Sequence, residues 1–323
     1  MVGRVSLNEE RRCLTCASER GYGIYLSVPL ERYCWRSFAG GGFSFAELFG
    51  QSRVLALVGG RPSPCGFSES SIVLWDDESS RRLWELKLFS PIVGVITRRG
   101  FLAAVLENKL VLYRIAHDFS WVRLERSLET LANPSGICTM SSPTTLSASS
   151  GEVSLPASRG SRPEEDRWFV VTHDDAHKHP IAHLALNRDG SYLASASRSG
   201  ELIRLWGTQQ GTSLVLMREL RRGSTAAAIY SISFSAKSDI LCCSSDSGTV
   251  HLFSLQPAQS SLHARSNSYL MQVNRSRPLV PPDWFLAGRE LCAKWTERFC
   301  TGGVSCTRIF TCLLTFLLHF RRR

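Results

Sequence analysis

One pattern recurs along most of the 323 residues and restricts the fold more than any other feature. A short β-rich segment leads into a polar turn with Gly or Asn, and a second segment then ends in an aromatic residue. Five clear copies span residues 13–26, 54–76, 101–115, 192–206 and 240–253, and their terminal aromatics are Tyr25, Trp75, Tyr113, Trp206 and Phe253. A weaker copy, GEVSL, spans residues 151–155. With this copy included, the spacing approaches the roughly 40–45 residues of one propeller blade.

These repeats predict an all-β fold, a WD-repeat-type β-propeller with six blades countable in residues 1–256. Small and apolar residues alternate within each copy, as expected of strands that pack between neighbouring blades. No stretch shows a sustained helical period. Residues 141–166 are rich in Ser, Pro and Gly and predict a long loop around one weak strand. The alternative is another all-β fold, such as a sandwich.

The positive charge of the chain lies mostly in its last part. The formal net charge is +10, but residues 257–323 hold ten Lys or Arg and three Asp or Glu, which leaves only +3 for residues 1–256. We therefore expect no nucleic-acid partner. The sequence opens without a secretory signal, so its 11 cysteines indicate a reducing, cytoplasmic setting. The longest apolar run, residues 309–320, has 12 residues and is too short to span a bilayer.

The most informative motif is ELRRG, residues 219–223, which lies between the two clearest repeats. Consecutive side chains of an extended chain point to opposite faces, so Arg221 and Arg222 are expected to serve two separate pockets. The planar, permanently charged guanidinium is the side chain best matched to phosphate. Gly223 is expected to let the backbone turn sharply and approach a ligand closely.

In this setting the sequence resembles the PROPPINs, the WD-repeat propellers that bind phosphoinositides in autophagy. The resemblance covers roughly residues 5–255 and is most specific where LRRG is followed by AAIYSISFS and SSDSGTVHLF. It extends upstream through AHKHPIAHLALNRDGSYLASASRSGELIRLW and, more loosely, through VLALVGG and the later VLWDD. The resemblance implies seven blades and a membrane-recruited scaffold that binds phosphatidylinositol 3-phosphate and 3,5-bisphosphate during autophagosome formation.

The resemblance also implies two head-group pockets, one on each side of the double arginine. The first would use Arg221, Arg204, Ser197 and His177, and the second would use Arg222, Ser245, Thr249 and His251. Arginines would neutralise phosphate, while hydroxyl and imidazole groups would fix its position. Two modest pockets on one membrane would gain by avidity. Glu201 stands where the family usually has Thr, and a carboxylate there would weaken the first pocket.

Beyond residue 256 the sequence predicts two further segments. Residues 257–283 mix apolar and basic residues, and the resemblance places a membrane-inserting loop of the sixth blade here, with Tyr269, Leu270 and Met271 as candidates. Residues 284–323 lack the repeat pattern and form a divergent tail in place of a seventh blade. The resemblance implies peripheral association with phagophore or endosomal and vacuolar membranes, with autophagy scaffold proteins as partners.

Two other functions remain open on sequence alone. The chain could be a protein-interaction scaffold without working lipid pockets. It could also be a metal-dependent hydrolase, because His173, Asp174, Asp175, His177, His179 and His183 form a dense cluster of potential ligands. Cys13 and Cys16 form a CxxC without a second such pair, and they are typical of a strand interior. We expect no enzyme activity, no metal and no cofactor.

Overall fold

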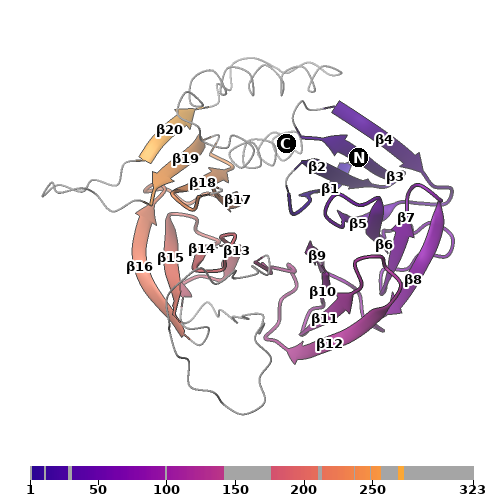
Figure 1. The fold of residues 1–323 in the computed structure, drawn as a ribbon. Coiled ribbons are helices and arrows are strands. Elements are labelled where there is room, and N and C mark those ends of the chain that lie inside the picture. Colours follow the sequence, from indigo (N-terminus) through magenta and orange to yellow (C-terminus); the bar gives the residue numbers. More distant parts are fainter. Residues whose placement is uncertain are drawn as a thin grey trace, which may run out of the picture.

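The computed structural model describes residues 2–10, 12–27, 31–98, 100–141, 176–209, 213–235, 237–247, 249–255 and 268–272. Within these residues the chain forms five four-stranded antiparallel sheets, each built from consecutive strands. The sheets are arranged as blades around a common centre, with the first strand of each blade innermost (Figure 1). The all-β propeller predicted from the repeats is confirmed.

Each blade follows the chain in order. The first blade comprises β1 (Val2–Leu7), β2 (Cys13–Ser18), β3 (Gly21–Leu26) and β4 (Glu31–Ser37). The second comprises β5 (Phe43–Leu48), β6 (Val54–Gly59), β7 (Ser71–Asp76) and β8 (Arg81–Lys87). The third comprises β9 (Gly94–Arg98), β10 (Phe101–Val105), β11 (Lys109–Ile115) and β12 (Val122–Glu129).

The two remaining blades carry the double arginine and its surroundings. The fourth comprises β13 (Ile181–Leu186), β14 (Tyr192–Ser197), β15 (Leu202–Gln209) and β16 (Ser213–Arg221). The fifth comprises β17 (Ile229–Phe234), β18 (Ile240–Ser245), β19 (Thr249–Ser254) and β20 (Ser268–Gln272).

Burial explains why the repeats could be recognised. The second strand of a blade is covered on both faces, and β6 and β10 are buried at every residue. Such strands show as short apolar runs in the sequence. The outer strands, such as β8, are half exposed and mostly polar. All five predicted aromatics lie in the third strand of their blade, and Phe253 there is 1% exposed.

Apolar side chains of adjacent blades form shared cores. One such core joins the second and third blades and includes Leu74 and Leu102. Another joins the fourth and fifth blades through Ile203, Leu220 and Phe234. Burying one such side chain contributes about 1.5–3 kcal/mol, so these contacts hold the ring of blades together.

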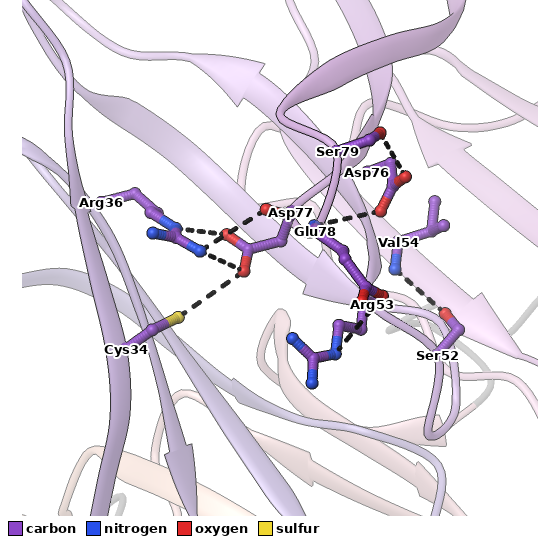
Figure 2. A network of polar contacts seen from close by, with 9 residues as sticks. All are labelled: Cys34, Arg36, Ser52, Arg53, Val54, Asp76, Asp77, Glu78 and Ser79. Carbon is purple, nitrogen blue, oxygen red and sulfur yellow. Dashed lines mark hydrogen bonds and ion pairs between the residues drawn. The ribbon is translucent and has the colours of Figure 1, made fainter.

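A buried carboxylate also ties the first blade to the second (Figure 2). Asp77 follows β7 and accepts hydrogen bonds from Arg36 at 2.7 and 2.9 Å and from the Tyr22 hydroxyl at 2.7 Å. Burial opposes ionisation of Asp77, but the bonds from Arg36 and Tyr22 outweigh it and keep the pKa of Asp77 below its usual value. The pair is therefore charged at neutral pH and links the outer strand of one blade to the next.

Some predictions fall outside the described residues, and one is corrected. The weak copy at 151–155 and the tail at 284–323 lie outside them, so the sixth and seventh blades stay predictions. Residues 268–272, predicted to belong to a membrane-inserting loop, instead form β20, which pairs with β19 through Leu252 and Tyr269. Cys13 and Cys16 lie in β2, as predicted. In the described part of the chain, no helix is long and apolar enough to cross a bilayer.

Candidate functional site

The two arginines of the ELRRG motif lie where the fourth blade leads into the fifth. Arg221 is the last residue of β16 and pairs with Leu202 of β15, while Arg222 follows the strand. Leu220 is fully buried in the core shared with the fifth blade, and Arg222, two residues on, lies on that same side. Arg222 is 6% exposed, whereas Arg221 is exposed on the opposite face. That the two arginines serve two separate ligand pockets stays a prediction.

Arg222 connects the fourth blade to the fifth through a set of oxygen acceptors. Its guanidinium donates to the Gly200 carbonyl at 2.6 Å, to the Thr225 carbonyl and to the Ser247 hydroxyl at 3.2 Å. Gly200 has a φ of +62°, and a Cβ there would lie 1.9 Å from the Ala227 carbonyl oxygen. A side chain at this position would clash with the backbone, so glycine is what allows the Gly200 carbonyl to reach Arg222.

A row of hydroxyl groups continues from Arg222 into the fifth blade. The Ser247 hydroxyl lies 2.8 Å from both the Ser245 and Thr249 hydroxyls, and Thr249 lies 3.1 Å from His251 Nε2. We call Arg222, Ser245, Ser247, Thr249 and His251 the Arg222 cluster. The structure thus brings together all four residues predicted for the second pocket. It adds Ser247, a turn residue that sequence reasoning missed although it lies two positions from both Ser245 and Thr249.

The charge of Arg222 is not cancelled within this cluster. In the described part of the chain, its side-chain hydrogen bonds go to carbonyl and hydroxyl oxygens, and no carboxylate forms an ion pair with it. Burial and the neighbouring Arg222 lower the pKa of His251 to about 4, so this imidazole is neutral at pH 7. A neutral imidazole and three hydroxyls can each donate or accept a hydrogen bond. The cluster therefore combines one uncompensated cation with adaptable polar groups.

The residues predicted for the first pocket are arranged differently. Arg204 is paired across the strands with Glu219, and its Nε and Nη2 both lie 2.8 Å from Glu219 Oε1. Its Nη1 donates to the carbonyl of Ala176. Glu219 and Arg221 are two residues apart in β16 and share a face, so a carboxylate lies between the two cations predicted to bind phosphate. Sequence reasoning singled out Glu201, but the carboxylate that contacts Arg204 is Glu219.

His177 and Ser197 each have partners of their own. His177 Nε2 lies 2.8 Å from the hydroxyl of Ser195, which also accepts from Trp206 Nε1 at 2.8 Å. Burial and Arg204 lower the pKa of His177. The Ser197 hydroxyl lies 2.9 Å from that of Ser199. The structure therefore places these two residues on the blade of Arg204 without joining them to Arg221 by direct contact.

The structure answers the expectation for Gly223, whereas three of the six candidate metal ligands lie outside the described residues. Gly223 shows no positive φ, and a Cβ there would meet nothing within 4 Å, so the backbone does not require glycine for a sharp turn. The space beside Gly223 is open.

Among the described residues no three His, Cys, Asp or Glu converge to hold a metal ion. His177 bonds to Ser195, and His173, Asp174 and Asp175 lie outside the described residues.

Comparison with known proteins agrees with the propeller fold. A profile of the PROPPIN family matches residues 81–275. The chain belongs to the PROPPIN family. It is 32% identical to SVP1-like protein 2 of Schizosaccharomyces pombe over 79% of this PROPPIN and 68% of that protein. It is 29% identical to autophagy-related protein 18 of Yarrowia lipolytica, with coverage of 80% and 68%. Its fold is similar to that of Kluyveromyces lactis Hsv2, with a TM-score of 0.62, 18% identity and coverage of 86% and 85%.

Proposed function

We propose that this PROPPIN binds the phosphorylated head groups of phosphoinositides on membranes and acts there as a scaffold rather than as an enzyme. The Arg222 cluster carries this proposal. It holds a buried cation that no carboxylate of the described residues pairs with, beside groups that can donate hydrogen bonds to phosphate. Charge-assisted hydrogen bonds contribute roughly 1.5–3 kcal/mol each, so a few of them give a modest affinity. The Arg222 cluster is the primary head-group pocket in this proposal.

The first pocket is the weaker of the two in this proposal. Glu219 pairs with Arg204, so a phosphate must compete with a carboxylate for the same guanidinium. Arg221 is exposed, and among the described residues it forms no ion pair, so it supplies the charge that attracts the second head group. Two pockets of unequal strength on one membrane still raise the total affinity through effective concentration.

The proposed ligands are phosphatidylinositol 3-phosphate and phosphatidylinositol 3,5-bisphosphate, and the proposed process is autophagosome formation. The family membership and the name of the Yarrowia lipolytica relative support this choice. Autophagy scaffold proteins are the proposed partners, and phagophore or endosomal and vacuolar membranes the proposed location. The candidate insertion residues Tyr269, Leu270 and Met271 lie in β20, the outer strand of the fifth blade. We propose that this strand contacts the membrane.

The second candidate function is a protein-interaction scaffold without working lipid pockets. The ion pair between Arg204 and Glu219 favours it, because this pair leaves the first pocket with one cation fewer for phosphate.

Calorimetric titration with short-chain phosphatidylinositol 3-phosphate separates the two functions. Wild type should bind, and Arg221→Thr combined with Arg222→Thr should abolish binding. Arg123→Thr combined with Arg126→Thr, which removes two exposed arginines from β12, should bind as wild type does and controls for net charge. Thr249→Val removes one hydroxyl of the Arg222 cluster without changing charge and should weaken binding severalfold. A folded wild type that does not bind would favour the scaffold without lipid pockets.

A further inference from the structure

Three consecutive apolar side chains are exposed in the outer strand of the fourth blade. Val215, Leu216 and Met217 of β16 are 43%, 44% and 52% exposed. We call these three residues the β16 stripe. In a regular strand, consecutive side chains alternate between faces, so at most every second one is expected to face solvent. Two things therefore need an explanation: why three consecutive side chains are exposed, and why all three are apolar.

The local cause is an irregularity in strand pairing. Trp206 pairs with Leu216, but Leu205 pairs with Arg218, so Met217 is the extra residue of a β-bulge. A Cβ at Gly207 would lie 2.8 Å from Met217 Sδ, so the absence of a side chain at Gly207 leaves room for the methionine. Leu214, at the start of the same strand, packs against the core cluster that contains Trp206 and holds the strand against the blade. The stripe is thus displayed on a fixed strand.

The stripe lies on the strand that ends in Arg221 of the proposed first pocket. Arg221 ends the same strand four residues after Met217, a distance of about 13 Å at roughly 3.3 Å per residue. Arg218, between them, donates from Nη1 to the Ser254 carbonyl at 3.0 Å and fixes β16 against the fifth blade. A membrane that presents a head group to Arg221 therefore lies within reach of the stripe.

We propose that the β16 stripe is a membrane-docking surface that inserts into the interfacial region of the lipid bilayer while the arginine pockets hold head groups. This inference rests on the proposed function. Three half-exposed side chains offer far less than the roughly 800 Å² per partner of a stable protein interface. A bilayer interface, in contrast, accepts single apolar side chains next to cations, and two weak signals combine into stable attachment. The occupant is therefore a phospholipid surface rather than a second copy of the chain.

The test compares a soluble ligand with vesicles. In the triple variant Val215→Thr, Leu216→Thr and Met217→Thr, threonine removes the apolar surface and keeps a high strand propensity. Calorimetry with short-chain phosphatidylinositol 3-phosphate should give the wild-type affinity, because the pockets are intact. Flotation with phosphatidylcholine vesicles that contain phosphatidylinositol 3-phosphate should show that the triple variant binds at least about tenfold more weakly than wild type. Leu124→Thr plus Leu131→Thr, which removes exposed leucines of the third blade, is the matched control and should float as wild type does.

Each outcome decides the matter. Unchanged vesicle affinity of the triple variant, with soluble ligand still bound, would overturn the β16 stripe and leave the proposed function standing. An equal loss of vesicle affinity in the control variant would also overturn the proposal, because exposed leucines anywhere on the surface would then contribute to membrane binding. Failure of the wild type to bind the soluble ligand would overturn the proposed function itself. A dimeric wild type that becomes monomeric in the triple variant by analytical ultracentrifugation would assign the stripe to a second copy and refute membrane docking.

Discussion

Acid should destabilise the propeller through His251, and asparagine at that position should remove this sensitivity. The pKa of His251 lies at about 4 in the folded chain, against an ordinary value of 6.5. The unfolded chain therefore binds a proton more tightly than the folded one, and stability present above pH 6.5 is lost as the pH falls towards 4. With these two pKa values, linkage gives a loss of about 2 kcal/mol between pH 8 and pH 5.

The assay is urea unfolding of wild type and His251→Asn at pH 8 and pH 5, followed by tryptophan fluorescence. Other histidines, such as His183 with a pKa of about 4, add to the wild-type loss, so the informative quantity is the difference between the two proteins. His251→Asn should lose about 2 kcal/mol less than wild type over this range. His117→Asn, an exposed residue, serves as control. An equal loss in wild type and His251→Asn would refute the argument that His251 is held neutral.

Two further predictions concern the arginine pockets. Glu219→Gln should keep the fold and raise the affinity for short-chain phosphatidylinositol 3-phosphate severalfold, because Arg204 then carries an uncompensated charge; calorimetry that shows unchanged or weaker binding would contradict the shielding role of Glu219. Gly200→Ala should destabilise by more than about 1 kcal/mol in urea unfolding and weaken head-group binding, because a Cβ would strike the Ala227 carbonyl at a φ of +62°. Gly223→Ala, where a Cβ meets nothing within 4 Å, should change the free energy of unfolding by less than about 0.5 kcal/mol, and an equal effect of both substitutions would exclude the steric explanation.

The blades and the proximity of Arg222, Ser245, Thr249 and His251 could be predicted from the sequence because their signals are local. Each blade combines a second strand that is buried at all or all but one of its residues with a third strand that carries an aromatic residue in its second half, and both leave a clear pattern. Ser245, Thr249 and His251 lie within seven residues of one hairpin, so their proximity needs no knowledge of distant contacts. Arg222 reaches them because the chain turns directly from the fourth blade into the fifth.

The first pocket could not be predicted as well, because it depends on the register between two strands. Residues 209 and 213 set the hairpin between β15 and β16, and from that register Arg204 would face Arg218. The bulge at Met217 shifts the pairing by one residue and places Glu219 opposite Arg204. Nothing in the local sequence marks the bulge, so sequence reasoning points to Glu201 and not to Glu219.

The same bulge decides which arginine faces which blade. A shift of one residue moves every following side chain to the other face of the sheet. In the register set by Trp206 and Leu216, Arg221 would point towards the fifth blade and Arg222 away from it. The extra residue Met217 reverses this, so that Arg222 meets Ser247 while Arg221 stays exposed beside Glu219. One inserted residue therefore sets the different surroundings of the two proposed pockets and also exposes the apolar stripe that we assign to the membrane.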